Sequence, residues 1–365
     1  MSASAEELAS MFNERFPSNS EPAATPATDA SAGEVARIVH HAVGQAKRLL
    51  SVPEAGLVNA VLRKLAAELA GGPPPRLSPA ATVAEYFSHP RWLVERWFAR
   101  FGADATRRLL EWNQRPAVVH LRWRSGEGDP APDWLRPTSW PGFFEVPPGR
   151  WGEVEPLLDA GRAYVQDPST RLAVELLDAA PGETVLDVCA SPGGKSVHLA
   201  DRMGRGRLFA LDLPGARIDR LRENLARVSG VETRIVPADL LRGVGERLKA
   251  AGAPATFPAV MLDVPCSNTG VMRHRIDVKW RLRSEDFSRH ARQQRRMLAE
   301  AARLVAPGGR LVYSTCSIDA DENEGVVAAF LEKEGARFGL DSRILALPWE
   351  CGHDGAAAFL LRLRE

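Results

Sequence analysis

The chain has 365 residues, of which 45% are hydrophobic, and its 47 basic residues nearly balance its 46 acidic ones. This length and composition exclude a chain that is disordered throughout and predict roughly two or three packed units. The formal net charge of +1 excludes a globally basic nucleic-acid coat, so any affinity for RNA or DNA has to come from a local patch.

The cysteines and the apolar segments indicate where the protein works. Cys189, Cys266, Cys316 and Cys351 are too far apart in the sequence for a zinc knuckle or a CxxC redox site, and no metal site is predicted. No apolar run reaches the roughly 18 to 20 residues of a membrane span, and the start of the chain lacks the regions of a signal peptide. We therefore expect a soluble, cytoplasmic protein without a membrane partner.

The first part of the chain changes character twice. Residues 1–33 are predicted to be a disordered tail, because 17–33 are rich in Pro, Ser, Ala and Thr and contain no large apolar residue. Apolar residues at helical spacing, interrupted by Pro53, predict two or three helices over 34–70. The proline-rich stretch at 71–79 then predicts a linker, with a boundary at about residue 78.

Residues 79–165 predict a small α/β subdomain. A helical group at 80–114 carries an aromatic face, for which core packing is favoured over base stacking because the spacing is helical. Alternating side chains at 118–123 then predict a strand.

From residue 166 to the end, strands and helices alternate. The expected strands are 184–189, 207–211, 233–236, 259–264 and 310–315, and the expected helices lie near 168–179, 193–202, 215–228, 284–305 and 322–333. Alternation with nearly continuous apolar strands indicates an α/β fold with a mostly parallel sheet covered on both faces. Ligands of such sheets bind at the carboxyl ends of the strands.

A glycine-rich turn, VLDVCASPGGKS at 185–196, joins the first of these strands to a helix. Glycines let the backbone approach a ligand, and the amides of the following helix can bind an anion. The spacing matches neither GxGxxG nor GxxxxGK[ST], which argues against a nicotinamide dinucleotide and against a P-loop. A nucleotide-type ligand is still favoured over an ordinary turn.

Acidic residues end three successive strands, namely Asp212, Asp239 and Asp263. A single one could simply cap the next helix. Three in register favour an adenosine cofactor, because a carboxylate at such a position binds ribose hydroxyls and later ones reach the base or the substrate.

Two cysteines follow strands at the same edge, Cys266 in PCSNTG and Cys316 in TCS. A free cysteine is more often a buried small apolar residue than a nucleophile. The polar, glycine-bearing loops weaken that interpretation, so at this point both remain open.

A local basic segment lies between these cysteines. Residues 273–303 contain ten Lys or Arg and four acids, a charge of +6, which would attract phosphates in a salt-dependent way. The loop residues Arg273, Arg275 and Lys279 are the predicted RNA contacts, whereas a solvated helix face remains an alternative for 289–303.

Together these motifs closely resemble the RsmB/Nop/NSUN family of RNA cytosine-5 methyltransferases, especially its bacterial branch that acts on small-subunit ribosomal RNA. The resemblance is dense from YVQDPS at 164–169 to TCSIDADENE at 315–324, and weaker at 88–97 and 56–64. It implies a Rossmann-like S-adenosylmethionine-dependent methyltransferase domain at 166–365, preceded at 79–165 by the N-terminal α/β subdomain of the catalytic module. Residues 34–78 would be a shortened NusB-like helical region with its linker.

The resemblance also implies roles for individual residues. The S-adenosylmethionine loop would consist of Cys189, Ala190, Ser191, Pro192, Gly193, Gly194 and Lys195. Asp212 would bind the ribose, Asp239 would lie near the adenine, and Asp263 would lie beside both the cofactor and the target base. Cys316 would be the nucleophile, and Cys266 would assist release of the product.

The implied activity is methylation of carbon 5 of a cytosine in RNA, foremost 16S ribosomal RNA, by a monomer. Transfer RNA is an alternative substrate. A non-catalytic RNA-binding ribosome assembly factor is an alternative of another class, but such a protein has no evident need for both Cys266 and Cys316.

Overall fold

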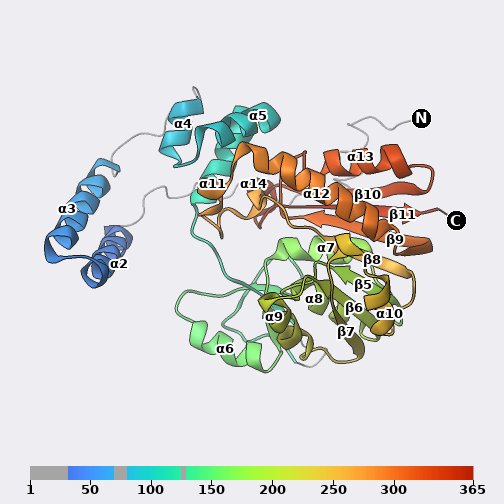
Figure 1. Cartoon of the computed structure of the whole chain (residues 1–365). Helices are drawn as coiled ribbons and strands as arrows, with labels where there is room; N and C mark the ends of the chain where they lie inside the picture. Colours follow the sequence, from blue (N-terminus) through green and yellow to red (C-terminus); the bar gives the residue numbers. More distant parts are fainter. Residues whose placement is uncertain (1–31, 70–79, 125–128, 365) are drawn as a thin grey trace. The chain divides into compact units, whose positions relative to one another are not determined.

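The computed structural model describes residues 32–69, 80–124 and 129–364 (Figure 1). It divides the chain into two compact units, Met1–Arg76 and Leu77–Glu365. Of the predicted tail at 1–33, residues 1–31 lie outside the described residues, as does the predicted boundary near residue 78, whereas 32 and 33 belong to a helix.

The described part of the first unit is a helical hairpin of α2 (Ala32–Leu49) and α3 (Val52–Leu69), which confirms helices over this region. Pro53 lies in the first turn of α3, where a missing backbone N–H costs nothing. Ala46 and Ala55 are its buried hydrophobic residues among those described, whereas apolar side chains such as Leu57 remain exposed. The hairpin therefore has only a small core of its own.

The second unit begins with α4 (Ala80–Tyr86) and α5 (Arg91–Gln114). The aromatic face of α5 is internal, with Trp97 fully buried and Trp112 nearly so. The ring of Trp92 packs edge-on against Phe287 of the large helix α12. The prediction that these aromatic residues pack in a core is confirmed.

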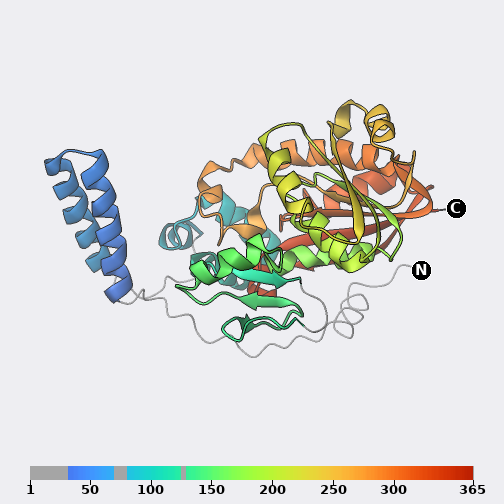
Figure 2. The same ribbon diagram turned by 90° about the horizontal axis from the view of Figure 1, so that it is seen from below.

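A small antiparallel sheet follows, and the predicted strand near 118–123 is its β1. The elements are β1 (His120–Trp123), β2 (Arg136–Pro137), β3 (Phe143–Glu145), α6 (Trp151–Asp159) and β4 (Ala163–Val165). The strand order is β2-β3-β1-β4, and these teal to green strands form a sheet separate from the large one (Figure 2).

The large sheet has the order β10-β11-β9-β8-β5-β6-β7. Its strands are β5 (Thr184–Val188), β6 (Gly206–Asp212), β7 (Val231–Pro237), β8 (Phe257–Asp263), β9 (Val305–Thr315), β10 (Phe338–Ala346) and β11 (Ala356–Leu363). Strands β5 to β9 are parallel and confirm the five predicted strands. The antiparallel strands β10 and β11 were not predicted from the sequence.

Helices cover both faces of this sheet (Figure 1). They are α7 (Arg171–Leu177), α8 (Gly194–Met203), α9 (Ala216–Leu225), α10 (Gly245–Ala250), α12 (Ser284–Ala302) and α13 (Glu324–Glu334). The short helices α11 (Val278–Arg281) and α14 (Pro348–Cys351) instead contribute to the core with α4 and α5. Side chains of α7, α8 and α9 pack in one apolar core, and those of α10, α12 and α13 pack in another. Since successive residues of a strand point to opposite faces, the two cores lie on the two sides of the sheet.

The predicted mixed α/β fold with a mostly parallel sheet is thus confirmed. Within the described part of the chain, no helix is both long enough and apolar enough to span a membrane.

Candidate functional site

The glycine-rich turn between β5 and α8 is held in place by three hydrogen bonds. The amide of Ser191 donates to Asp212 Oδ2 (2.7 Å), and Arg217 donates to the Ser191 carbonyl (2.8 Å). Asn224 of α9 donates to the carbonyl of Pro192 (2.7 Å). The predicted cofactor loop therefore has a fixed shape that does not depend on a ligand.

Gly193 cannot be replaced without disturbing this loop. Its φ of +110° lies in the left-handed region that favours glycine. A Cβ there would also lie 3.1 Å from Leu221 Cδ1 and 3.3 Å from Asn224 Cβ. The glycine thus lets the turn pack directly on α9.

The three predicted acids lie at or just past the carboxyl ends of β6, β7 and β8, but their partners differ. Asp212 is buried, and its second oxygen accepts a hydrogen bond from the Leu213 amide (2.7 Å). Asp239 accepts from the Leu241 amide (3.0 Å) and so caps a short 3-10 helix, which is the simpler role considered for it. Asp263 instead contacts side chains.

Asp263 forms an ion pair with Lys195, the last residue of the predicted cofactor loop. Its Oδ2 lies 2.7 Å from Lys195 Nζ, and its Oδ1 accepts from the Ser314 hydroxyl (2.7 Å). Burial alone would lower the pKa of Lys195, but Asp263 and, more weakly, Cys316 hold it above its ordinary value. A lasting positive charge therefore lies beside Cys316.

The structure brings the two predicted catalytic cysteines together, with Cys266 Sγ and Cys316 Sγ 3.1 Å apart. Cys266 is buried, whereas Cys316 is partly exposed. The Asn268 side chain bridges the pair: its Oδ1 accepts from Cys316 Sγ (3.2 Å), and its Nδ2 donates to the Cys266 carbonyl (3.0 Å). The contact with Cys316, together with burial, raises the pKa of the Cys266 thiol well above its ordinary value.

The thiol of Cys189 is unlike this pair. Burial raises the pKa of Cys189 above its ordinary value, and the neighbouring carboxylate of Asp212 acts in the same direction. Cys189 therefore contributes its backbone to the loop, since a buried thiol near carboxylates is a poor nucleophile.

A small cavity of about 90 Å³ lies beside Cys316 and Asp263. Cys316, Lys195 and Asp263 line one part of it, and Asp167 and Asp354 line another. The thiol proposed as nucleophile, the cation and the carboxylates thus face a common space.

A buried network that supports the thiol loops was not predicted. Glu322 is fully buried and accepts hydrogen bonds from the Ser267 amide (2.9 Å), from the Ser267 hydroxyl and from Gln294 Nε2 (3.1 Å). Thr315 donates to Asn323 Oδ1 (2.6 Å). These residues anchor the neighbours of both cysteines, but their spacing in the sequence gives no signal of it.

Asp187 in β5 is a second residue that the sequence analysis missed. Its carboxylate accepts a hydrogen bond from the Ser196 hydroxyl. Burial raises the pKa of Asp187 to about 7, and the nearby carboxylate of Asp263 adds to the effect. Only its position within the VLDVC motif, before a polar helix residue, could have suggested an interaction with the loop.

The basic loop after Cys266 is not uniformly exposed. Arg275 is exposed, but Arg273 is buried with its guanidinium 4.0 Å from the centre of the Trp112 ring, and Lys279 is buried as well. Burial lowers the pKa of both Arg273 and Lys279. Arg273 and Lys279 are therefore not exposed on the loop as the sequence suggested, and a direct RNA contact stays a prediction for all three residues.

Comparisons with known proteins agree with this site. A family profile described as 16S rRNA methyltransferase RsmB/F matches residues 174–343. Ribosomal RNA small subunit methyltransferase B of Sodalis glossinidius is 34% identical over 296 residues, which cover 76% of this chain and 64% of that protein. The protein of the same name from Xylella fastidiosa is 34% identical over 330 residues, which cover 84% of this chain and 74% of that protein.

A solved structure supports the same relationship. The crystal structure of PH0851 is similar with a TM-score of 0.72 and 25% sequence identity, and the match covers 91% of this chain and 78% of that one. The family resemblance drawn from the motifs is thereby confirmed. This chain belongs to the RsmB/F family of 16S rRNA methyltransferases.

Proposed function

We propose that the protein methylates carbon 5 of a cytosine in 16S ribosomal RNA, with S-adenosylmethionine as methyl donor, through a covalent bond between Cys316 and carbon 6. Family membership supports a methyltransferase that acts on ribosomal RNA. The observation that carries the finer proposal is the pair of thiols 3.1 Å apart beside the ion pair of Lys195 and Asp263.

The residues present fit the proposed cofactor. The loop at 189–195 lies at the carboxyl end of β5, where ligands of parallel sheets bind, and the carboxylates of Asp212 and Asp263 suit ribose hydroxyls and a positively charged sulfonium. When bound, S-adenosylmethionine would supply an electrophilic methyl group. The loop, Asp212 and Asp239 would bind and orient it.

Cys316 is the better placed of the two thiols for nucleophilic attack. It is partly exposed, lines the cavity and lies near the positive charge of Lys195. Its sulfur would bond carbon 6 of the cytosine, and carbon 5 would then have the electron density to accept the methyl group. Asp263, held by Lys195 and Ser314, would hydrogen-bond the ring and stabilise the charge that develops.

Release requires that the proton on carbon 5 leaves and that its electron pair expels the Cys316 sulfur. Cys266 is the residue that we propose to assist this step, because its sulfur contacts the sulfur that must leave. Its raised pKa means that the thiol holds a proton, which it can share with the departing sulfur. The base that takes the carbon 5 proton is not assigned.

The test uses the full chain with Cys266→Ala, incubated with S-adenosylmethionine and either 16S ribosomal RNA or transfer RNA. A denaturing gel should show a stable protein–RNA adduct with 16S ribosomal RNA, because release is impaired while attack is not. Cys316→Ala, alone and combined with Cys266→Ala, is the matched control and should form none.

Several outcomes would contradict the proposal. An adduct that persists without Cys316, or 5-methylcytosine formed by Cys316→Ala, would remove the nucleophile. An adduct with transfer RNA alone would change the substrate. Binding of RNA without any 5-methylcytosine from the unmodified chain would favour the non-catalytic assembly factor. The cytoplasmic location and the monomeric state stay predictions.

A further inference from the structure

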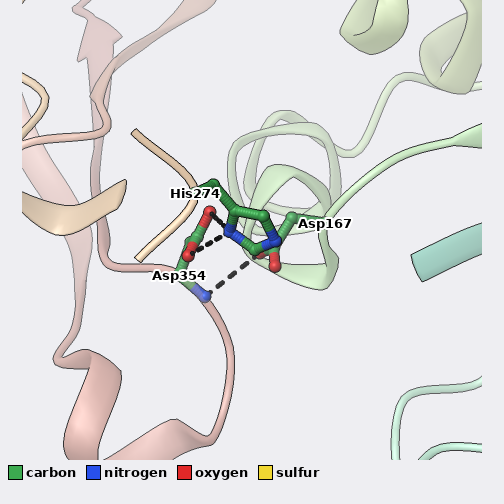
Figure 3. A group of neighbouring side chains, drawn as sticks. All are labelled: Asp167, His274 and Asp354. Carbon is green, nitrogen blue, oxygen red and sulfur yellow. Dashed lines mark hydrogen bonds and ion pairs between the residues drawn. The ribbon is translucent and has the colours of Figure 1, made fainter. Parts of the chain in front are cut away.

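A second group of titratable side chains lies beside the thiol site and has no part in the proposed reaction. Asp167, His274 and Asp354 come from separate segments and point toward one another (Figure 3). One ligand atom from each lies within 4.8 Å of the others. The sequence analysis predicted no metal site, because the spacing between these residues matches no ligand motif.

The hydrogen bonds of His274 fix the orientation of its ring. Its Nε2 lies 3.0 Å from the Val118 carbonyl, and its Nδ1 lies 2.9 and 3.0 Å from the two carboxylate oxygens of Asp354. Since a carbonyl only accepts, Nε2 carries a proton, and without an ion Nδ1 also donates to the Asp354 carboxylate, so a metal ion would replace the proton between these two groups. Metal-binding histidines typically donate their other N–H to a backbone carbonyl in this way.

Asp167 is oriented just as firmly. Its Oδ1 accepts hydrogen bonds from the Ser169 amide (2.9 Å) and the Asp354 amide (3.2 Å). Neighbouring donor atoms around one ion, with bonds of about 2.1 Å, lie about 3 Å apart, which is the separation found between His274 and Asp354. His274 and Asp354 are therefore spaced as two ligands of a single cation, and a carboxylate oxygen of Asp167 lies within 4.8 Å of both.

A buried histidine next to the cluster gives independent support. His120 is only 4% exposed, and its Nδ1 lacks a hydrogen-bond partner. This nitrogen points at Asp167 Oδ2 from 3.6 Å, and that oxygen also lacks a partner. At 3.6 Å these two atoms form only a long ion pair, and neither has a hydrogen-bond partner, which leaves both with the capacity to bind an ion.

We propose that Asp167, His274 and Asp354 bind one divalent transition-metal ion, with His120 as a further ligand or support. A donor set of imidazole nitrogen and carboxylate oxygen suits Mn²⁺, Fe²⁺ or Zn²⁺ better than Ca²⁺. The buried guanidinium of Arg273 interacts with both carboxylates, so affinity should be lower than at a site without it. Because Asp167 and Asp354 also line the cavity with Cys316, the ion would place positive charge on its wall.

The test is a titration of the full chain with Mn²⁺ under reducing conditions, followed by the loss of the free-ion electron paramagnetic resonance signal. Mn²⁺ is the probe because thiolates bind softer metals more strongly. We expect saturable binding of about one ion per chain. His274→Gln and Asp354→Asn should each weaken it by about tenfold or more.

Two controls define the site. Asp219→Asn removes an exposed carboxylate that forms an ion pair with Arg222. This variant should bind Mn²⁺ as the unmodified chain does. The double variant Cys266→Ser and Cys316→Ser should also bind Mn²⁺ normally. Thermal melting without metal shows whether each variant is folded. If Asp354→Asn does not fold, the test rests on His274→Gln, because the His274 side chain is 29% exposed and its replacement disturbs the fold less.

Absence of saturable binding would overturn the proposal and leave a protonated His274 in an ion pair with Asp354. Binding that His274→Gln leaves intact, or that the cysteine variant abolishes, would overturn it too. The readout involves no methyl transfer, so the result is independent of the proposed function.

Discussion

Two groups of strands, β5 to β7 and β9, carry site residues at the same edge of the large sheet, and they hold these residues by different means. On the side of β5, β6 and β7, the predicted cofactor residues are fixed by backbone amides close by, as with Asp212 and the amides of Ser191 and Leu213. On the side of β9, the neighbours of the thiols are fixed by buried side chains, above all Glu322.

This difference bears on robustness. A backbone amide is present whatever the side chain, so a loop held by amides tolerates many substitutions. A network of buried side chains depends on each member, because the loss of one leaves the others without partners. The thiol side should therefore be the more fragile half of the site.

The sharpest test of that contrast is Glu322→Ala. It removes three hydrogen bonds to a buried carboxylate, each worth about 1.5 to 3 kcal/mol, and leaves the Ser267 amide without an acceptor, whereas Gln294 keeps its bond to the Pro265 carbonyl. The free energy of unfolding should therefore fall by about 3 kcal/mol or more. Urea denaturation measures it. The control is Glu324→Ala, which removes a carboxylate that is 35% exposed and lies 3.4 Å from the Arg100 guanidinium. This variant should lose less than about 1 kcal/mol of the free energy of unfolding. Equal losses of stability in Glu322→Ala and Glu324→Ala would contradict the idea that the thiol side is the more fragile.

The side of β5 offers a test through pH. Asp187 has a pKa of about 7 in the folded chain, so between about pH 4 and pH 7 the folded state holds a proton that the unfolded state has lost. Its contribution to stability is therefore present at low pH and is lost as pH rises through 7, by roughly 2 to 3 kcal/mol between pH 5 and pH 8. Asp187→Asn should remove this part of the pH dependence in urea denaturation. If the free energy of unfolding of Asp187→Asn changed with pH as it does in the unmodified chain, the raised pKa of Asp187 would be refuted.

A smaller effect is expected for the amide-held acids. Asp212→Asn keeps an oxygen acceptor but loses the charge, so the dissociation constant for S-adenosylhomocysteine should rise about tenfold, or about 1.4 kcal/mol. Calorimetric titration measures it, with Asp219→Asn as the control. Unaltered affinity would show that Asp212 only shapes the loop.

The smallest effect concerns the basic loop. Arg275→Ala should weaken RNA binding slightly and lower the slope of log affinity against log salt by about one. Arg273→Ala should instead lower the melting temperature, because its guanidinium packs on Trp112 inside the protein. A salt slope that responds to Arg273 and not to Arg275 would reverse this distinction.

The parallel strands and the acids at their ends could be predicted because their signal is local. Each strand is a short apolar run followed by a turn, and the carboxyl ends of parallel strands meet at one edge. The strand β11 could not be predicted in the same way. Its sequence, AAAFLLRL, is rich in good helix formers, and it is a strand because β9 and β10 flank it.

The other residues of the site could not be predicted because their partners are distant in the sequence. Glu322 and Ser267 are 55 residues apart, and Arg273 meets a tryptophan on α5. The charge pattern that predicted an exposed loop carries no information about such distant partners. The two cysteines could be predicted as site residues only because the family resemblance supplied what spacing alone left open.

The contact between the two sulfurs has a consequence for the order of events. Before the reaction, the neighbouring sulfur of Cys316 disfavours negative charge on Cys266. In the proposed adduct, the Cys316 sulfur would be an uncharged thioether and that repulsion would be gone. The acidity of Cys266 would then increase only while an adduct is present. The Cys266 thiol would thus hold its proton firmly in the resting enzyme and release it more readily once the adduct has formed. Formation of the adduct would therefore determine when the product can be released.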